Sequence, residues 1–271
     1  MKVPQLGLAA LAFTTSVLAL PQPSDSSQSP STESHLERRD EPSSSSSSSS
    51  QSEQPPRPKE YKYFHEPGGD DIMGHYDTRF FSGVVSDEVR VDTLTHMTRA
   101  YLNFFREHGL ETWIAHGTLL GWWWNGKLLP WDWDVDTQVS GATLAYLGDH
   151  FNQTRAKYVS HDKKVKREYL LDINPFSRQR DRGEGLNIID ARWIDTRNGL
   201  YIDITGLSEL NPESDPGVLE CKNHHKYKIR DLYPLRSSTY EGVPARIPFT
   251  YDQMLVKEYG PGSLSVTEFQ E

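Results

Sequence analysis

Three aspartates between Pro130 and Asp136 have the type and spacing that metal chemistry needs. The segment reads Pro-Trp-Asp-Trp-Asp-Val-Asp. Alternate side chains of a strand point to one face, so Asp132, Asp134 and Asp136 can point the same way. Neighbouring carboxylates repel one another unless a cation lies between them, and carboxylate oxygens suit Mg²⁺ or Mn²⁺. An EF-hand is excluded, because positions 6 and 12 of its loop would both be threonine here. The remaining alternative is a solvated acidic face on an edge strand, which the interleaved tryptophans disfavour.

A fourth aspartate stands inside an apolar strand pattern further along the chain. Asp203 lies within Tyr-Ile-Asp-Ile-Thr, residues 201–205. Burying a lone carboxylate is costly, so we expect Asp203 to meet the same metal from a neighbouring strand. The alternative is a structural aspartate whose hydrogen bonds are satisfied inside the fold. Asp190 and Asp195 are weaker candidates, and Asp195 is expected in a turn.

The segment His-Gly-Thr-Leu-Leu-Gly, residues 116–121, is suited to an anionic ligand. Glycine lets a backbone approach a phosphate closely, and a helix N-terminus attracts anions. Thr118 adds a hydroxyl donor beside Gly117. Such a corner is common by itself, and it becomes specific because the aspartate strand follows within 20 residues.

Hydrophobic spacing and helix-end signals indicate the elements that must position these groups. Leu94, Met97 and Tyr101 recur at helical spacing between Ser86, a good N-cap, and Gly109, a good stop. The other expected elements are a short strand at 112–115, a turn and short helix at 117–124, a strand at 135–139, a helix at 142–151, strands at 186–194 and 200–204 joined by an Asn-Gly turn, and a helix at 251–259. This order predicts an α/β protein with a mixed sheet.

The N-terminal part of the chain carries secretion and linker signals. The apolar run from Leu6 to Leu20 is shorter than the ~20 residues of a membrane span. We interpret residues 1–19 as a signal peptide, with an uncleaved signal anchor as the alternative. Residues 20–60 are rich in Ser, Pro and Gln and predict a disordered tether. Residues 61–271 are expected to fold, with a possible N-glycan at Asn152. The expected location is the secretory pathway, in the Golgi lumen or at the cell surface after secretion.

Composition excludes several classes of protein. The 271 residues hold one Cys, so neither an internal disulfide nor a cysteine-rich zinc cluster can form. The formal net charge of −9 disfavours nucleic-acid binding, which depends on clustered Lys and Arg. We predict no zinc site from Cys221, His224 and His225, because two adjacent histidines rarely bind one ion together.

Taken together, the motifs resemble the LicD/fukutin family of the nucleotidyltransferase fold. The resemblance rests on residues 116–121 and 130–136, and it extends through Asp203 to Tyr233-Pro234-Leu235, Phe249 and Glu258-Tyr259-Gly260. The Trp-rich segment 121–127 and residues 221–224 look most like the fungal mannosylphosphorylation branch. The resemblance implies a polymerase-β-like core with flanking helices.

The resemblance also implies roles for the aspartates. It assigns catalysis and metal binding to Asp134, Asp136 and Asp203, with Mg²⁺ or Mn²⁺ as the cofactor. Asp132 matches the first acid of the family's longer motif and is expected to bind or orient the metal.

Donor-phosphate binding is implied for Gly117 and Thr118. Many members of the family have a basic residue where this chain has Trp124. Lys127 is the expected substitute for that positive charge. The cluster of tryptophans at 122–124 is interpreted as packing, or as a surface on which a base or sugar stacks.

The expected activity is metal-dependent transfer of a sugar phosphate from a nucleotide diphosphate donor, GDP-mannose, to a glycan hydroxyl. Two alternatives remain. One is a non-catalytic regulator or partner of a Golgi mannosylphosphate transferase. The other is a glycosyltransferase with an Asp-x-Asp motif, although such enzymes usually place a nucleotide-binding half ahead of that motif.

Overall fold

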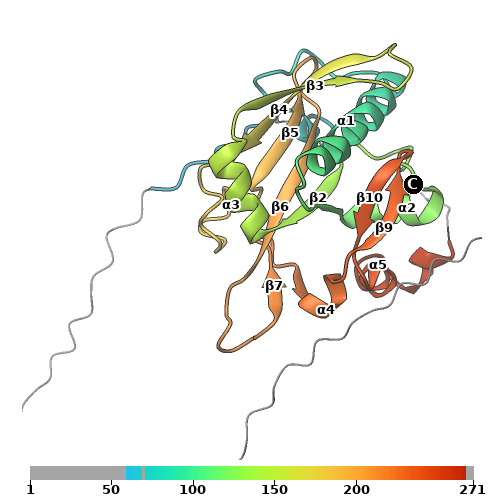
Figure 1. Cartoon of the computed structure of the whole chain (residues 1–271). Helices are drawn as coiled ribbons and strands as arrows, with labels where there is room; N and C mark the ends of the chain where they lie inside the picture. The colour runs from blue at the N-terminus through green and yellow to red at the C-terminus, as the bar shows by residue number, and fades with distance from the viewer. Residues whose placement is uncertain (1–58, 69–70, 267–271) are drawn as a thin grey trace, which may run out of the picture. The chain divides into compact units, whose positions relative to one another are not determined.

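A mixed β-sheet is the main framework of the described residues (Figure 1). The computed structural model describes residues 59–68 and 71–266, so the expected signal peptide and nearly all of the expected tether lie outside the described residues. The strands are β1 (Trp113–Ile114), β2 (Asp136–Ser140), β3 (Thr154–Val159), β4 (Lys166–Ile173), β5 (Ala191–Asp195), β6 (Tyr201–Glu209), β7 (Val218–Glu220), β8 (Lys226–Lys228), β9 (Arg236–Tyr240) and β10 (Val243–Ile247). The helices are α1 (Asp87–Glu107), α2 (His116–Asn125), α3 (Gly141–His150), α4 (Ile229–Leu232) and α5 (Tyr251–Tyr259), with short 3₁₀ turns η1 (Met73–His75) and η2 (Pro261–Leu264).

The strand order explains how distant segments meet. The main sheet runs β1-β2-β6-β5-β4-β3, with β7 added to β6 and β8 to β7, while β9 and β10 form a separate pair. β2 and β6 are parallel, and the other neighbouring pairs of the described sheet are antiparallel. The predicted α/β class with a mixed sheet and flanking helices is confirmed.

Helix α1 begins and ends close to the predicted residues. The Ser86 side chain accepts a hydrogen bond from the Val89 backbone N–H, and Gly109 adopts a φ of 66° just after the helix. The face carrying Leu94 and Met97 is fully buried. Among the residues that the structure describes, no helix combines the length and apolar character needed to cross a bilayer.

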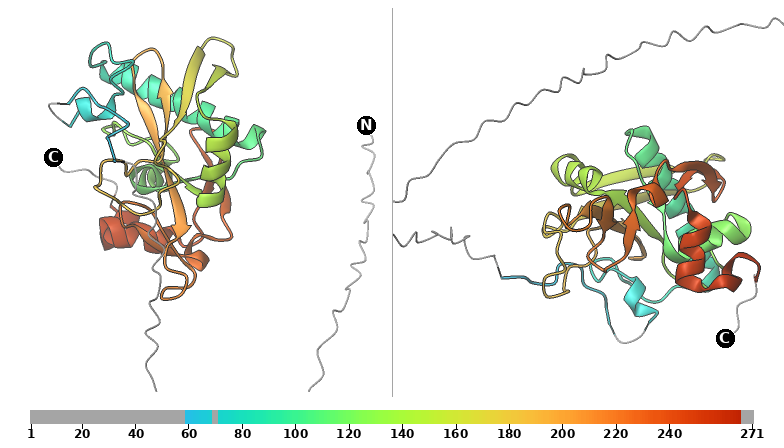
Figure 2. Two further views of the ribbon diagram at one scale, coloured as in Figure 1. Left: turned by 90° about the vertical axis from the view of Figure 1, so that its left-hand side faces the viewer. Right: turned by 90° about the horizontal axis from the view of Figure 1, so that it is seen from below.

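Different hydrophobic clusters pack on the two faces of the sheet. α1 and α3 share one hydrophobic cluster with strand residues such as Trp193. The next residue, Ile194, points to the opposite face and packs with Leu170, Tyr201 and Phe80. In the left view of Figure 2, the N-terminal segment and α3 accordingly lie on opposite sides of the sheet.

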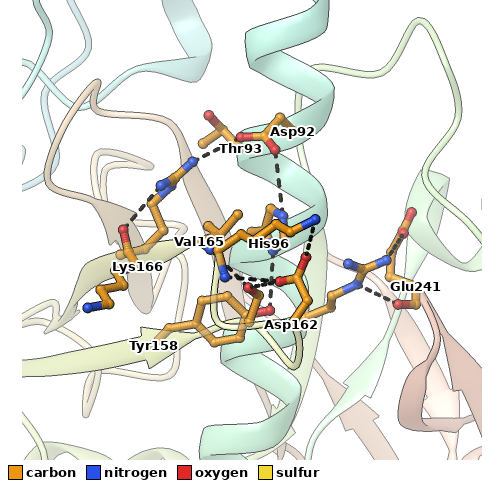
Figure 3. A network of polar contacts seen from close by, with 12 residues as sticks. Asp92, Thr93, His96, Tyr158, Asp162, Val165, Lys166 and Glu241 are labelled. Atoms are coloured by element: carbon orange, nitrogen blue, oxygen red, sulfur yellow. Dashed lines mark hydrogen bonds and ion pairs between the residues drawn. The ribbon is translucent and has the colours of Figure 1, made fainter.

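Polar contacts join α1 to the β3–β4 hairpin and to the β9–β10 turn (Figure 3). His96 Nδ1 lies 3.2 Å from the Tyr158 hydroxyl of β3, and Asp92 pairs with Arg167 of β4 at 3.1 Å. Arg99 donates to the Glu241 carbonyl at 2.7 Å. These contacts fix the long helix against elements that are far from it in the sequence.

Two strand predictions were wrong in extent. β2 starts at Asp136, so Asp132 and Asp134 lie in an extended segment before the strand. The strand expected at 186–194 begins only at Ala191, because the residues before it form a loop. The β3–β4 hairpin was not predicted, since its exposed face carries charged residues that hide the apolar alternation.

Candidate active site

A cavity of about 540 Å³ opens where β2 begins and α2 starts. Its lining side chains come from α2, from the segment that precedes β2, from β6, from the β7–β8 turn and from the end of α5. The residues that line it are His116, Gly117, Leu120, Trp124, Leu129, Trp131, Asp132, Asp134, Asp136, Ile189, Thr205, Asn223, His225, Glu258 and Tyr259. The cavity therefore joins the aspartate motif to the Gly-Thr corner, as the sequence predicted.

The three motif aspartates reach one cavity although only the last belongs to a strand. Arg90 of α1 holds the preceding segment, since its guanidinium donates to the carbonyls of Pro130 (2.7 Å) and Asp132. The same guanidinium carbon lies 4.7 Å from the centre of the Trp133 ring. The buried Arg90 thus substitutes for the ladder hydrogen bonds of a strand. Sequence reasoning missed this residue.

Asp203 lies directly beside Asp136. The two residues are register partners on the parallel strands β2 and β6, and the Asp203 N–H donates to the Val135 carbonyl at 3.0 Å. Asp203 is not among the cavity-lining residues, and its side chain is 17% exposed. The structure therefore brings the four acids together, with Asp203 beneath the other three.

Electrostatics in the cavity favour a bound cation. Burial and the neighbouring Asp134 carboxylate raise the pKa of Asp132 to about 8. Burial, again with Asp134, raises the pKa of Asp136 to about 8. Burial also raises the pKa of Asp203, although Arg192 opposes this shift. Carboxyl groups with raised pKa values indicate that negative charge here lacks compensation within the chain.

The donor set fits a hard divalent ion that is shared with a substrate. Within residues 59–68 and 71–266, no group of three or more His, Cys, Asp or Glu side chains is arranged to hold a metal by itself. Mg²⁺ is commonly held by one or two carboxylates together with water and substrate phosphates. The carboxylates of Asp134 and Asp136 in an open cavity match that kind of site. Their metal-binding role remains a prediction, as do those of Asp132 and Asp203.

Arg192 is a second residue that sequence reasoning missed. Its Nε donates to Asp203 Oδ1 at 2.9 Å, and its Nη2 donates to Glu66 Oε1 at 2.7 Å. The guanidinium also lies over the Tyr201 ring, 3.6 Å from the centroid. Arg192 and Asp203 face each other across the β5–β6 hairpin. Counting back from the Asn-Gly turn could have found this pair.

Of the three residues expected to bind the donor phosphate, only Gly117 lines the cavity. Gly117 lines the cavity, and a Cβ there would lie 3.1 Å from Asp132 Oδ2, so a larger residue would press on that carboxylate. Thr118 is buried, and its hydroxyl accepts from the Asp136 N–H at 2.8 Å, which anchors the start of β2. Lys127 is exposed after α2 and is not among the lining residues. The phosphate roles of these three residues remain predictions.

A histidine–glutamate pair forms the opposite wall of the cavity. His116 Nδ1 lies 2.6 Å from Glu258 Oε1, and the ring centroids of His116 and His225 are 4.4 Å apart. Burial lowers the pKa of His116, but Glu258 and Asp136 outweigh it and raise the pKa above its ordinary value. The Glu-Tyr-Gly motif of residues 258–260 was noted in the sequence without a role.

The tryptophans at 122–124 have a packing role. The Trp122 indole N–H donates to Ser238 Oγ of β9 at 2.8 Å. Those of Trp123 and Trp124 donate to the carbonyls of Leu264 (3.1 Å) and Ser263 (2.9 Å), which fixes η2 against α2. Trp124 also lines the cavity and meets Trp131 at 6.0 Å between ring centroids. Asn152, the expected glycosylation site, is exposed between α3 and β3, and its modification remains a prediction.

The mixed α/β sheet and the acidic cavity beside a helix N-terminus fit a nucleotidyltransferase-type domain, which the family comparison identifies. A family model described as "LicD/FKTN/FKRP, nucleotidyltransferase domain" matches residues 109–250, and the chain belongs to this family.

Two relatives come from Saccharomyces cerevisiae. Mannosyltransferase regulator 4 is 37% identical over 218 residues, which are 78% of this chain and 18% of the relative. Mannosyltransferase regulator 14 is 37% identical over 159 residues, 55% of this chain and 17% of the relative. The chain therefore spans about a fifth of the length of these relatives. The predicted family and its fungal branch are confirmed.

Proposed function

We propose that this protein is a metal-dependent transferase that moves a sugar phosphate from a nucleoside diphosphate sugar to a glycan hydroxyl. The observation that carries the proposal is the meeting of Asp134 and Asp136 in one cavity, with Asp203 beside Asp136. Membership of the LicD family supports transferase chemistry. Similarity to two yeast proteins named as mannosyltransferase regulators supports a place in mannosylphosphorylation. GDP-mannose is the donor that we propose.

The chemistry requires positioning and charge stabilisation more than covalent work by the protein. Asp134, Asp136 and Asp203, with Asp132 nearby, would hold Mg²⁺ or Mn²⁺, and the ion would supply neutralisation of the donor diphosphate. The acceptor oxygen attacks the phosphorus that carries the sugar, and the bond to the bridging oxygen breaks. A nucleoside monophosphate leaves, and the hydroxyl proton passes to a cavity carboxylate.

The other cavity residues have supporting tasks in this proposal. Gly117 leaves room for the diphosphate close to the backbone. Arg192 and Glu66 hold Asp203 in a single orientation under the site. Trp124, Trp131 and Tyr259 provide aromatic surfaces on the cavity wall for the donor's rings.

The proposal is tested with the purified full chain, GDP-mannose, a mannose oligosaccharide and Mn²⁺ or Mg²⁺. We expect release of GMP and a glycan that carries an acid-labile sugar phosphodiester. Asp134→Asn should abolish transfer while leaving the thermal unfolding curve intact. Asp149→Asn, which changes an exposed side chain of α3, is the matched control and should retain full activity. Full activity in Asp134→Asn would overturn the proposal.

A regulatory function is the second candidate, because both relatives are named as regulators. The chain would then bind a Golgi mannosyltransferase and alter its activity. Absence of product from the chain alone, together with stimulated transfer by a purified mannosyltransferase, would favour this function. A glycosidic product in place of a phosphodiester would instead indicate an ordinary glycosyltransferase. A luminal Golgi location or secretion to the cell surface belongs to either proposal.

A further inference from the structure

A second cavity, of about 500 Å³, adjoins the acidic one. Its lining residues come from β8, α4 and α5 and from the chain beside them. Helices α4 and α5 lie in the lower part of Figure 1. The residues that line it are His224, His225, Lys226, Tyr227, Asp231, Thr250, Gln253, Met254, Lys257 and Glu258. His225 and Glu258 line both cavities and form the wall between them.

This shared wall is tied to the acidic site. Glu258 accepts from His116, and the His225 ring packs against the same His116 ring. Burial lowers the pKa of His116, but Glu258 and the nearby Asp136 carboxylate raise it, so the wall lies within electrostatic reach of the predicted metal ligands. A ligand in the second cavity that extends past this wall arrives directly at the acids.

The second cavity has the chemistry of a sugar site. Tyr227 and Met254 are half-buried and pack on the cluster below them, which gives a floor that matches the C–H face of a sugar ring. Thr250 and Gln253 offer hydrogen-bonding groups suited to hydroxyls, with the Thr250 hydroxyl oriented by the Asp231 carbonyl at 3.1 Å. The acidic cavity differs, because three aspartates and Glu258 line it beside its aromatic side chains.

Lys257 adds a positive charge at the junction. It is exposed on α5 next to the shared Glu258, and its charge opposes protonation of His225. Lys226, across the cavity, is already paired with Glu220 at 2.9 Å. A cation beside the wall stabilises an acceptor oxygen as it loses its proton, and the phosphodiester formed there.

We propose that the second cavity is the acceptor subsite, which binds an oligosaccharide and presents one hydroxyl across the His225–Glu258 wall. This inference rests on the proposed function. The donor occupies the acidic cavity, the acceptor oxygen forms the new bond to phosphorus, and the nucleoside monophosphate leaves on the donor side. Two adjacent cavities thus separate the two substrates of one transfer.

The test uses the full chain with the double substitution Gln253→Ala and Lys257→Ala. Both side chains are exposed on α5, so the fold should persist. We expect the KM for a mannose oligosaccharide to rise about tenfold, equal to about 1.4 kcal/mol of lost binding, while the KM for GDP-mannose stays within twofold. Lys157→Ala, on edge strand β3, is the control and should change neither constant.

Calorimetric titration of the oligosaccharide in the absence of donor separates this inference from the proposed function. Saturable binding that the double substitution weakens supports the acceptor subsite, even if the wild-type chain proves to have no transferase activity. Active transfer with an unchanged acceptor KM in the double variant overturns the subsite and leaves the proposed function standing. Failure of the wild-type chain to bind the oligosaccharide at millimolar concentration also overturns the subsite.

Discussion

At the scale of single residues, the four aspartates differ in how the protein compensates their charge. Asp203 has an ion pair with the buried Arg192, whereas Asp132 and Asp136 face other acids and have raised pKa values. Sequence reasoning could predict that the acids meet, because their spacing and apolar surroundings demand it. It missed Arg192 as the partner, because the pairing becomes visible only when the hairpin register is counted back from the Asn-Gly turn.

Replacement of Arg192 should therefore be costly. Arg192→Met leaves Asp203 without its buried partner, and we expect a loss of about 3 kcal/mol in the free energy of unfolding. Urea denaturation followed by tryptophan fluorescence measures this loss. Arg155→Ala breaks an exposed pair with Glu168 and should cost less than about 1 kcal/mol. Equal effects of the two substitutions would contradict the structural role of Arg192.

At the scale of elements, α2 is fixed by a close approach at Gly121, which the sequence showed only as part of a glycine-containing corner. A Cβ on Gly121 would lie 2.6 Å from the Lys127 carbonyl oxygen and 3.2 Å from Leu129 Cγ. Helix α2 therefore packs on the returning chain without a side chain between them. The hydrophobic pattern predicts a helix here but does not report this approach, since contact distances have no signature in spacing.

Alanine substitution of two helical glycines should have opposite effects. Gly121→Ala forces backbone and Leu129 apart, and we expect it to destabilise the protein by about 1–3 kcal/mol. Gly148→Ala in α3 meets only Ile173 Cγ2 at 3.8 Å, and it should stabilise by about 0.5–1 kcal/mol through helix propensity. Differential scanning calorimetry of both variants checks the signs. Stabilisation by Gly121→Ala would refute the close approach.

The contact between α1 and β3 should make stability depend on pH. Burial lowers the pKa of His96 below its ordinary value, against the opposing effect of Asp92. The unfolded chain then binds a proton more readily than the folded one. His96 therefore contributes stability above the unfolded pKa near 6.5, and this stability is lost as the pH falls through the folded pKa. We expect the wild-type Tm to fall between pH 7 and pH 5 more steeply than that of His96→Gln. Parallel Tm profiles would contradict this assignment.

At the scale of the whole molecule, the segment before α1 belongs to the folded unit and contacts residues that support the site. Glu60 accepts from Asn187 and Glu184, Tyr63 donates to Asp172, and Glu66 pairs with Arg192. The sequence placed the start of the domain at residue 61, because composition changes there. It did not show that this polar segment contacts Arg192, the residue that pairs with Asp203.

Removal of this segment should weaken the whole unit. A chain that begins at residue 59 should unfold at the same temperature as the full chain. A chain that begins at residue 71 loses the buried Phe64, about 1.5–3 kcal/mol of apolar burial, as well as the Glu66 pair. We expect its Tm to fall by at least about 5 °C. Unchanged thermal unfolding of the shorter chain would show that the segment does not contribute to the stability of the folded unit.

The parallel pairing of β2 with β6 has a consequence for the time course of folding. α3 and the strands β3, β4 and β5 lie between these two strands in the sequence, and the antiparallel pairs β3–β4, β4–β5 and β5–β6 connect neighbours. Local pairs close short loops and form early, whereas β2 must wait for β6 across a long loop. Asp136 and Asp203 therefore meet late in folding. A nascent chain that has emerged only as far as β5 therefore cannot present the paired acids.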